Sequence, residues 1–164
     1  MESIIVSGGT KEQRYQALIP QIEALCAGEN DIIANMANIC AALREVFDFF
    51  WIGFYIVRKS DTHPDGERLV LGPFQGPVAC TSIAYGRGVC GTAWRERRVI
   101  IVPDVDQFPG HIACSSLSRS EIVVPVIKNE NVTAVLDLDS KELASFDEVD
   151  SKYLQQILTF LNQQ

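Results

Sequence analysis

The 164-residue sequence contains no long hydrophobic run. Its longest apolar stretch, FFWIGFYIV at residues 49–57, is far shorter than the roughly 20 residues that a membrane-spanning helix needs. The first residues, MESIIVSGG, lack the basic segment and the apolar core of a secretory signal peptide. We therefore expect a cytoplasmic location and no membrane partner.

Positive charge is scarce as well. The chain has 14 lysines and arginines against 21 aspartates and glutamates, which gives a formal net charge of -7. A surface of this sign repels the phosphates of nucleic acids, so no nucleic-acid partner is expected. Small cationic or zwitterionic ligands remain compatible with this charge.

The cysteine content argues against a structural disulfide framework. The number of cysteines, five, is odd, and the expected compartment keeps thiols reduced. Any disulfide should therefore be transient or catalytic. The five residues are Cys26, Cys40, Cys80, Cys90 and Cys114.

The chain also lacks internal repeats, low-complexity tracts and linkers, and its length suits one domain with a single core. We expect residues 1–164 to form one domain, on which residues 1–28 pack as an N-terminal helical extension. Apolar residues recur at helical spacing in 11–27 and again after Asp31, a candidate N-cap. The sequence therefore predicts two helices in its first third.

Two β-hairpins and a last helix are expected in the rest of the chain. A last helix is predicted with Ser145 as N-cap and Glu148 completing a capping box. The middle, from 75 to 120, is rich in loops and holds only a short helix and a short strand. The fold class is therefore α+β, an antiparallel sheet flanked by helices. The β-rich runs that form the hairpins lie at 50–57, 68–74, 121–128 and 132–140.

Three cysteines lie in this middle segment among small and polar residues. They are Cys80 in GPVACTS, Cys90 in GRGVCGTA and Cys114 in HIACSS. Three thiols in loops favour redox or metal chemistry over core packing. Cys26 and Cys40 instead coincide with the apolar stripes of predicted helices, where we expect small buried hydrophobic residues.

Zinc is the first alternative, because His111 and the three loop cysteines could form a Cys3His set. Their spacing does not support zinc, since Cys80 and Cys90 are ten residues apart and structural zinc ligands usually come in short pairs. We therefore expect no metal. The segment GRGVCG also matches the dinucleotide-binding pattern G-x-G-x-x-G, but no βαβ pattern surrounds it, so a tight turn is favoured.

The predicted strand AVLDLDS carries two acidic residues. Alternate residues of a strand share a face, so Asp137 and Asp139 point the same way. A solvated sheet face is the common explanation, but aspartate is a poor strand former, and a cationic amine as ligand would explain the pair. Glu121 begins the preceding strand and is either an ordinary edge charge or part of the same pocket.

Trp51 and Tyr55 stand an even distance apart, so they too can share a sheet face. Their role is either core packing or the wall of an apolar pocket. Loop thiols, carboxylates and an aromatic wall together fit a thiol reductase with a small ammonium-bearing substrate. In such an enzyme a thiolate attacks an oxidised sulfur while a carboxylic acid protonates the departing oxygen. A second cysteine then converts the sulfenic acid into a disulfide, which an external dithiol reduces.

Several motifs together resemble one family. The segments GPVACTSIAYGRGVCGTA, HIACSSLSRSEIVVPV and AVLDLDS, with WIGFY upstream, closely resemble the free methionine-(R)-sulfoxide reductases, which are built on the GAF domain. The resemblance runs from about Glu29 through the last helix and rests on three motifs in the same order. It implies a single GAF-like domain that reduces free methionine-(R)-sulfoxide to methionine.

The resemblance also implies roles for the cysteines. Cys114 matches the nucleophile, Cys80 matches the resolving cysteine, and Cys90 matches a cysteine that assists thiol exchange. Members of the family bind no cofactor, are recycled by thioredoxin and often form homodimers. We therefore expect thioredoxin as the external reductant and a homodimer here.

The same resemblance assigns the substrate pocket. Glu121, Asp137 and Asp139 match carboxylates that hold the substrate amine and assist at the sulfoxide oxygen. Trp51 and Tyr55 match the aromatic pocket around the methyl group.

Two other functions stay open at this point. A GAF domain can be a ligand-binding or sensory module without turnover, since a fold alone does not establish catalysis. A redox switch, in which Cys80 and Cys114 form a disulfide, would respond to oxidants without substrate selectivity.

Overall fold

The computed structural model describes residues 3–112 and 115–162. A six-stranded antiparallel sheet combines with four α-helices, which confirms the α+β class. None of the described helices has the length and apolar character needed to cross a membrane. The elements in chain order are α1 (Lys11–Ala27), α2 (Ile32–Phe47), β1 (Trp51–Lys59), β2 (Glu67–Gln75), β3 (Ser82–Ile83), α3 (Gly88–Glu96), β4 (Ile100–Val102), the 3-10 turn η1 (Val105–Gln107), β5 (Ser120–Lys128), β6 (Asn131–Ser140), α4 (Glu148–Leu158) and the 3-10 turn η2 (Thr159–Asn162).

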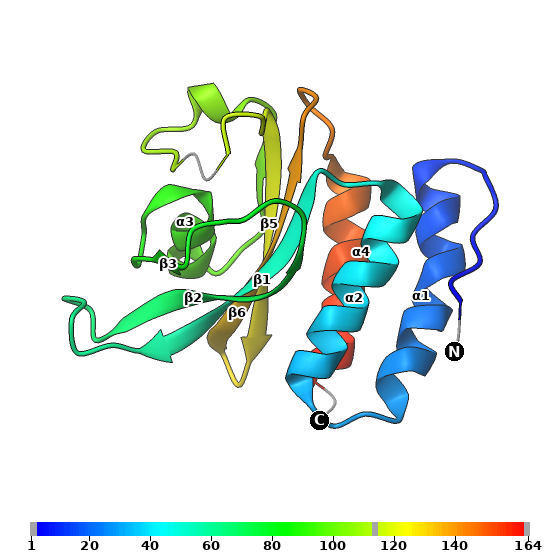
Figure 1. Ribbon diagram of the computed structural model, residues 1–164, viewed down its shortest axis with the longest axis horizontal. Helices are drawn as coiled ribbons and strands as arrows, with labels where there is room; N and C mark the ends of the chain where they lie inside the picture. Colours follow the sequence, from blue (N-terminus) through cyan, green and yellow to red (C-terminus); the bar gives the residue numbers. More distant parts are fainter. Residues whose placement is uncertain (1–2, 113–114, 163–164) are drawn as a thin grey trace.

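The strands follow the order β3-β2-β1-β6-β5-β4 (Figure 1). Both predicted hairpins are confirmed, β1 with β2 and β5 with β6. The second hairpin turns at Asn129 and Glu130, whose φ angles of 50° and 65° are both left-handed. Two successive left-handed residues match the twist of paired strands, so this short turn favours the hairpin. The register shifts by one residue between Val126 and Ile127, and this shift places Glu121 across from Asp139.

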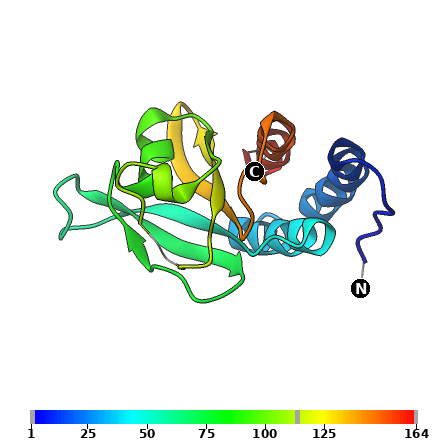
Figure 2. The same ribbon diagram turned by 90° about the horizontal axis from the view of Figure 1, so that it is seen from above.

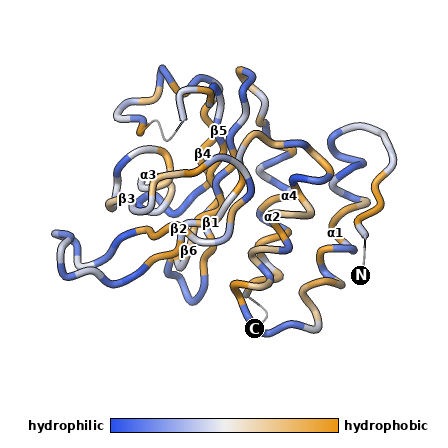
Figure 3. The backbone as a smooth tube through the Cα atoms, viewed as in Figure 1, coloured by the Kyte–Doolittle hydropathy of each residue, from blue (hydrophilic) through white to orange (hydrophobic). Residues whose placement is uncertain are grey.

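The sheet separates two layers of helix. Helices α1, α2 and α4 lie on one side, and α3 with the irregular middle segment lies on the other (Figures 1 and 2). Figure 3 shows hydrophobic residues concentrated along the central strands, whereas the turn between β1 and β2 is mostly hydrophilic. The two faces of the sheet therefore support different environments, a helical core and a face that carries the middle segment.

Strand alternation divides the core between these faces. On β1, Ile52 and Phe54 are fully buried against α1, α2 and α4, while Trp51 and Tyr55 turn to the opposite side. The even spacing of Trp51 and Tyr55 predicted this shared face, and the prediction is confirmed. Hydrophobic burial on both faces stabilises the sheet, at roughly 25 cal/mol for each Å² of apolar surface removed from water.

Helix α1 packs on α2 and α4 through fully buried side chains that include Tyr15 and Leu18. A capping box starts the helix, because Thr10 and Gln13 each accept a hydrogen bond from the other's backbone N–H. Pro20 lies inside the helix without ending it.

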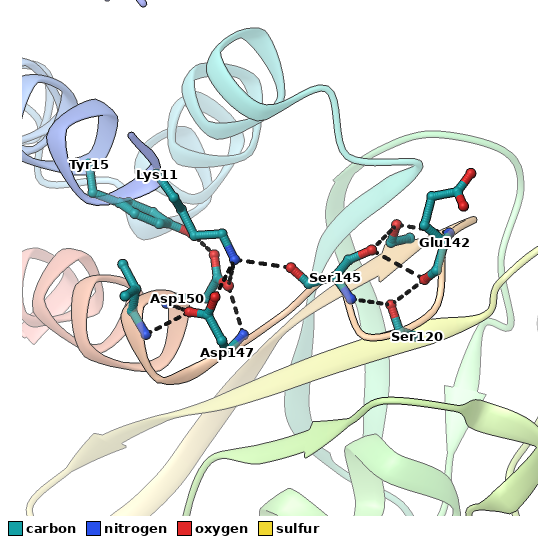
Figure 4. A network of polar contacts seen from close by, with 9 residues as sticks. Lys11, Tyr15, Ser120, Glu142, Ser145, Asp147 and Asp150 are labelled. Carbon is teal, nitrogen blue, oxygen red and sulfur yellow. Dashed lines mark hydrogen bonds and ion pairs between the residues drawn. The ribbon is translucent and has the colours of Figure 1, made fainter. Parts of the chain in front are cut away.

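A polar network ties α1 to the start of α4 (Figure 4). Lys11 Nζ donates to the carboxylates of Asp147 and Asp150 and, at 3.0 Å, to the backbone oxygen of Ser145. Tyr15 donates from its hydroxyl to Asp150 Oδ1 at 2.8 Å. Because Asp150 is 1% exposed, these partners satisfy a buried carboxylate.

The predicted start of the last helix is wrong. Helix α4 begins at Glu148, and its N-cap is Asp147, whose side chain accepts from the backbone N–H groups of Val149 and Asp150. Asp150 in turn accepts from the Asp147 backbone N–H and completes a capping box. The Ser145 hydroxyl instead donates to Ser140 Oγ at 2.7 Å, so it is not available for the helix.

Candidate active site

A pocket opens on the side of the sheet that carries α3. Its empty volume is about 590 Å³. Strands β1, β5 and β6, the first turn of α3 and the segment 77–79 line it, together with His111, Ile112, Ser115 and Ser118. Six of the predicted site residues are part of this lining: Trp51, Tyr55, Cys90, Glu121, Asp137 and Asp139.

The register of β5 and β6 brings three carboxyl groups together. Glu121 of β5 lies across from Asp139 of β6, and Asp137 lies two residues further along the same face. Glu121 is 6% and Asp137 7% exposed, so neither is an ordinary edge charge or part of a solvated face. The structure therefore supports the pocket interpretation for all three residues.

Burial raises the pKa of each carboxyl, and neighbouring carboxylates add to the rise for Glu121 and Asp137. Burial raises the pKa of Glu121 and of Asp137 well above their usual values, and the neighbouring carboxylates add to the shift. Burial also raises the pKa of Asp139 to about 6, although a hydrogen bond from Ser118 opposes the rise. Three carboxylates this close cannot all be ionised at neutral pH, so the cluster retains a proton.

Asp137 carries an acceptor that the protein does not use. Its Oδ1 is buried and has no hydrogen-bond partner among the described residues. An unpaired buried carboxylate oxygen is costly, by roughly 1–3 kcal/mol or more. A ligand that donates hydrogen bonds, such as an ammonium group, would remove this cost.

The cluster suits an organic cation better than a metal ion. Among the described residues, Cys90, Glu121 and Asp137 present ligand atoms that all lie within 4.8 Å of one another. Metal binding requires the thiolate and the carboxylates in their deprotonated forms. Burial raises the pKa of the Cys90 thiol well above its usual range and so opposes the thiolate that a metal ion requires, whereas an ammonium group needs no thiolate. His111, which the zinc alternative required, does not belong to this group.

Aromatic side chains of β1 form the wall beside the carboxyl groups, since Trp51 pairs with Asp139 in the register of β1 and β6. The rings of Trp51 and Tyr55 stack with centroids 6.0 Å apart, and those of Trp51 and Phe74 with centroids 5.6 Å apart. Trp51 Nε1 donates to the backbone oxygen of Pro77 and Tyr55 donates to that of Cys80, both at 3.0 Å. These hydrogen bonds fix both rings and leave an apolar surface towards the pocket.

Gly53 makes room for this wall. A Cβ at this position would lie 2.4 Å from the Trp51 ring and 2.5 Å from Phe74 Cβ. Any larger residue would therefore displace Trp51. This role could not be predicted from the sequence, since a glycine in a strand has several explanations.

The cysteines occupy three different environments. Cys26 and Cys40 are buried free thiols in the helical core, as predicted. Cys80 is disulfide-bonded and lies between β2 and β3. Cys114, the predicted nucleophile, lies outside the described residues, so its pairing with Cys80 stays a prediction.

The interpretation of Cys90 as a loop thiol is wrong. Cys90 lies in the first turn of α3 and is 4% exposed. The GRG sequence does form the predicted tight turn, since Gly86 and Gly88 have left-handed φ angles of 70° and 60°. This turn is followed by a helix that begins at Gly88, not by a loop. The helix places Cys90 in the lining of the pocket.

Two residues of the pocket were missed as site residues. Ser118 is 8% exposed and its hydroxyl donates to Asp139 Oδ1. His111 Nε2 lies 3.7 Å from Glu121 Oε2, and burial lowers the pKa of His111, which favours the neutral imidazole. A loop serine carries no sequence signal of such a contact, and the histidine was weighed only as a zinc ligand.

Comparison with known proteins identifies the fold. The family model of the GAF domain matches residues 29–161. The chain belongs to the GAF domain family. Its relatives include the GAF domain-containing protein A of Dictyostelium discoideum, at 60% identity over 98% of each chain. The free methionine-R-sulfoxide reductase of Escherichia coli is 43% identical over 92% of this chain and 88% of that enzyme.

A solved structure supports the same placement within the GAF family. The free methionine-R-sulfoxide reductase of Neisseria meningitidis, in complex with its substrate, superposes with a TM-score of 0.92 at 50% identity. The match covers 99% of this chain and 95% of that one. Within the GAF family the chain thus belongs with the free methionine-R-sulfoxide reductases, which confirms the resemblance seen in the motifs.

Proposed function

We propose that this protein reduces free methionine-(R)-sulfoxide to methionine. Membership of the family makes it an oxidoreductase that acts on a sulfoxide. One observation carries the proposal for the site: the carboxyl groups of Glu121, Asp137 and Asp139 lie beside the rings of Trp51 and Tyr55 in one pocket, on the same face of the sheet. A free amino acid with an apolar side chain presents the complementary pair, an ammonium and a methyl thioether end.

The carboxylates account for the preference for the free amino acid. The substrate ammonium donates to the unpaired Asp137 Oδ1 and to the neighbouring carboxylates. In a peptide the same nitrogen is an uncharged amide, which would leave the carboxylate charge without compensation. The methyl end packs against the Trp51 ring. This ring can occupy its position because Gly53 has no Cβ.

The reaction uses two thiols and one carboxyl proton. The Cys114 thiolate attacks the sulfoxide sulfur while a pocket carboxyl group protonates the oxygen. The sulfur–oxygen bond of the substrate breaks, methionine leaves, and the oxygen remains on Cys114 as a sulfenic acid. The Cys80 thiol then attacks that sulfur, a disulfide forms and water leaves. The substrate gains the two electrons that the thiols lose.

The remaining assignments rest on the resemblance. Thioredoxin reduces the disulfide by thiol–disulfide exchange and returns both cysteines to the reduced state. The protein works without a bound cofactor and as a homodimer. Its proposed cytoplasmic location is a separate expectation from the sequence.

The test is substrate-selective turnover. Loss of methionine-(R)-sulfoxide is measured with thioredoxin recycling, against the S epimer and a methionine sulfoxide peptide, for the wild type and Cys114→Ser. We expect turnover of the free R epimer alone, and its loss in the variant. Binding without turnover would establish a ligand-binding module instead. Oxidation by peroxide without substrate selectivity would establish a redox switch.

A further inference from the structure

We propose that Cys90 is a positioning residue that holds the Asp137 carboxyl group through its thiol hydrogen, and that it takes no part in disulfide exchange. The inference rests on the proposed function, because it concerns the pocket in which the sulfoxide would bind. It replaces the role in thiol exchange that the resemblance implies for Cys90.

The packing of α3 fixes the position of Cys90 in the wall of the pocket. The residue lies one position before Gly91, where a Cβ would come within 2.6 Å of the Ala84 backbone oxygen. Gly91 also exchanges backbone hydrogen bonds with Gly86 and Arg87. The first turn of α3 is thus packed directly on the preceding tight turn, which leaves the Cys90 side chain little freedom to move towards another thiol.

The thiol points at carboxyl groups. The Cys90 Sγ and one oxygen each of Asp137 and Glu121 lie within 4.8 Å of one another. The interactions of Asp137 with Cys90 and with Glu121 both lower the pKa of its carboxyl group, against the effect of burial. A thiol S–H is a donor, so Cys90 is the partner that holds Asp137 from α3. Asp137 Oδ1 has no hydrogen-bond partner among the described residues and stays open for the substrate.

The same surroundings oppose redox chemistry at this thiol. Disulfide exchange requires a thiolate, which forms readily at exposed and electropositive sites. Cys90 is 4% exposed. Burial, followed by the charges of Asp137 and Glu121, raises the pKa of its thiol well above the usual range. It therefore remains a neutral donor throughout the pH range of the enzyme.

Replacement of the thiol separates the two roles. Cys90→Ser keeps a hydrogen-bond donor but removes the sulfur, whereas Cys90→Ala removes both. We expect Cys90→Ala to lower kcat/KM about tenfold, because a hydrogen bond to a charged group is lost, and Cys90→Ser to recover most of that loss. Both variants should form the catalytic disulfide and accept electrons from thioredoxin as the wild type does.

The pH profile gives a readout that a merely structural defect would not move. The titratable groups around Asp137 are Cys90 of α3, Glu121 of β5, Tyr55 of β1 and Asp139 of its own strand. The Cys90 hydrogen bond lowers the pKa of Asp137, so its removal raises that pKa. The acidic limb of the kcat/KM profile should therefore move to higher pH in Cys90→Ala and return in Cys90→Ser.

A buried cysteine outside the pocket is the matched control. Cys40 is a free thiol with no exposed surface in the helical core on the other side of the sheet. Cys40→Ala should lower the melting temperature without moving the pH profile. The proposal would be overturned if Cys90→Ser and Cys90→Ala lost thioredoxin-coupled turnover to the same extent while each variant still reduced one equivalent of substrate normally. Failure of the proposed function would appear differently, as wild-type protein without sulfoxide turnover.

Discussion

Ser118 donates a hydrogen bond from its hydroxyl to Asp139 Oδ1, beside the point where β5 begins. Ser118 is 8% exposed, so this contact is largely shielded from water. The hydrogen bond counteracts the effect of burial, which raises the pKa of Asp139 to about 6. Asp139 therefore changes its charge within the pH range in which an enzyme is assayed.

Ser118→Ala should raise the pKa of Asp139 further. The fraction of protein with an ionised Asp139 near pH 6 would then be smaller, so the acidic limb of the kcat/KM profile should move to higher pH. We expect kcat/KM near pH 6 to fall about fivefold, because one hydrogen bond contributes about 1 kcal/mol. The loss should disappear at alkaline pH. Ser116→Ala, which changes an exposed serine of the same loop, is the control, and identical profiles for both variants would refute this role.

Gly53→Ala should damage the aromatic wall. The added Cβ would meet the Trp51 ring at 2.4 Å, so the ring must move out of its stack with Tyr55. We expect KM to rise and the free energy of unfolding to fall by about 1–3 kcal/mol, as for other overpacked cores. Intrinsic tryptophan fluorescence reports the ring and substrate titration reports the pocket. Gly28→Ala, with no atom near the added Cβ, is the control; an unchanged KM in Gly53→Ala would contradict the wall.

Tyr15→Phe should weaken the attachment of α1. The substitution removes the hydroxyl that donates to Asp150 Oδ1 at 2.8 Å and leaves that buried oxygen without this donor. We expect a loss of about 1–3 kcal/mol in the free energy of unfolding, measured by urea denaturation. Tyr85→Phe alters a tyrosine that is 40% exposed and should change stability little. Equal midpoints for the two variants would show that the network contributes nothing.

The parts of the fold that depend on local periodicity were predictable. The alternation of strands placed Asp137 with Asp139 and Trp51 with Tyr55, because a period of two is a property of any strand. Which residue lies across from Asp139 could not be predicted from the turn, because the register of β5 against β6 shifts by one residue between Val126 and Ile127. Family motifs then supplied the roles that periodicity cannot.

The errors arose where distant residues decide the local structure. Ser145 and Asp147 are both acceptable N-caps, and Asp147 takes the position while Lys11, 136 residues away in the sequence, pairs with it. Cys90 was predicted to lie in a loop because glycines surround it, yet two of these glycines, Gly86 and Gly88, form the turn from which α3 begins. The contact of Ser118 with Asp139 spans two elements, so no local pattern could indicate it.

The central claim is that buried carboxylates recognise the free ammonium group of the substrate. Isothermal titration of the Cys114→Ser protein with methionine-(R)-sulfoxide and its N-acetyl derivative tests this claim without turnover. We expect the free amino acid to bind at least about tenfold more tightly, because loss of a buried charge pair costs about 2 kcal/mol or more. Adding Asp137→Asn should abolish this preference, whereas Asp65→Asn at an exposed site should preserve it. Equal affinity for both compounds in the Cys114→Ser protein would contradict the account.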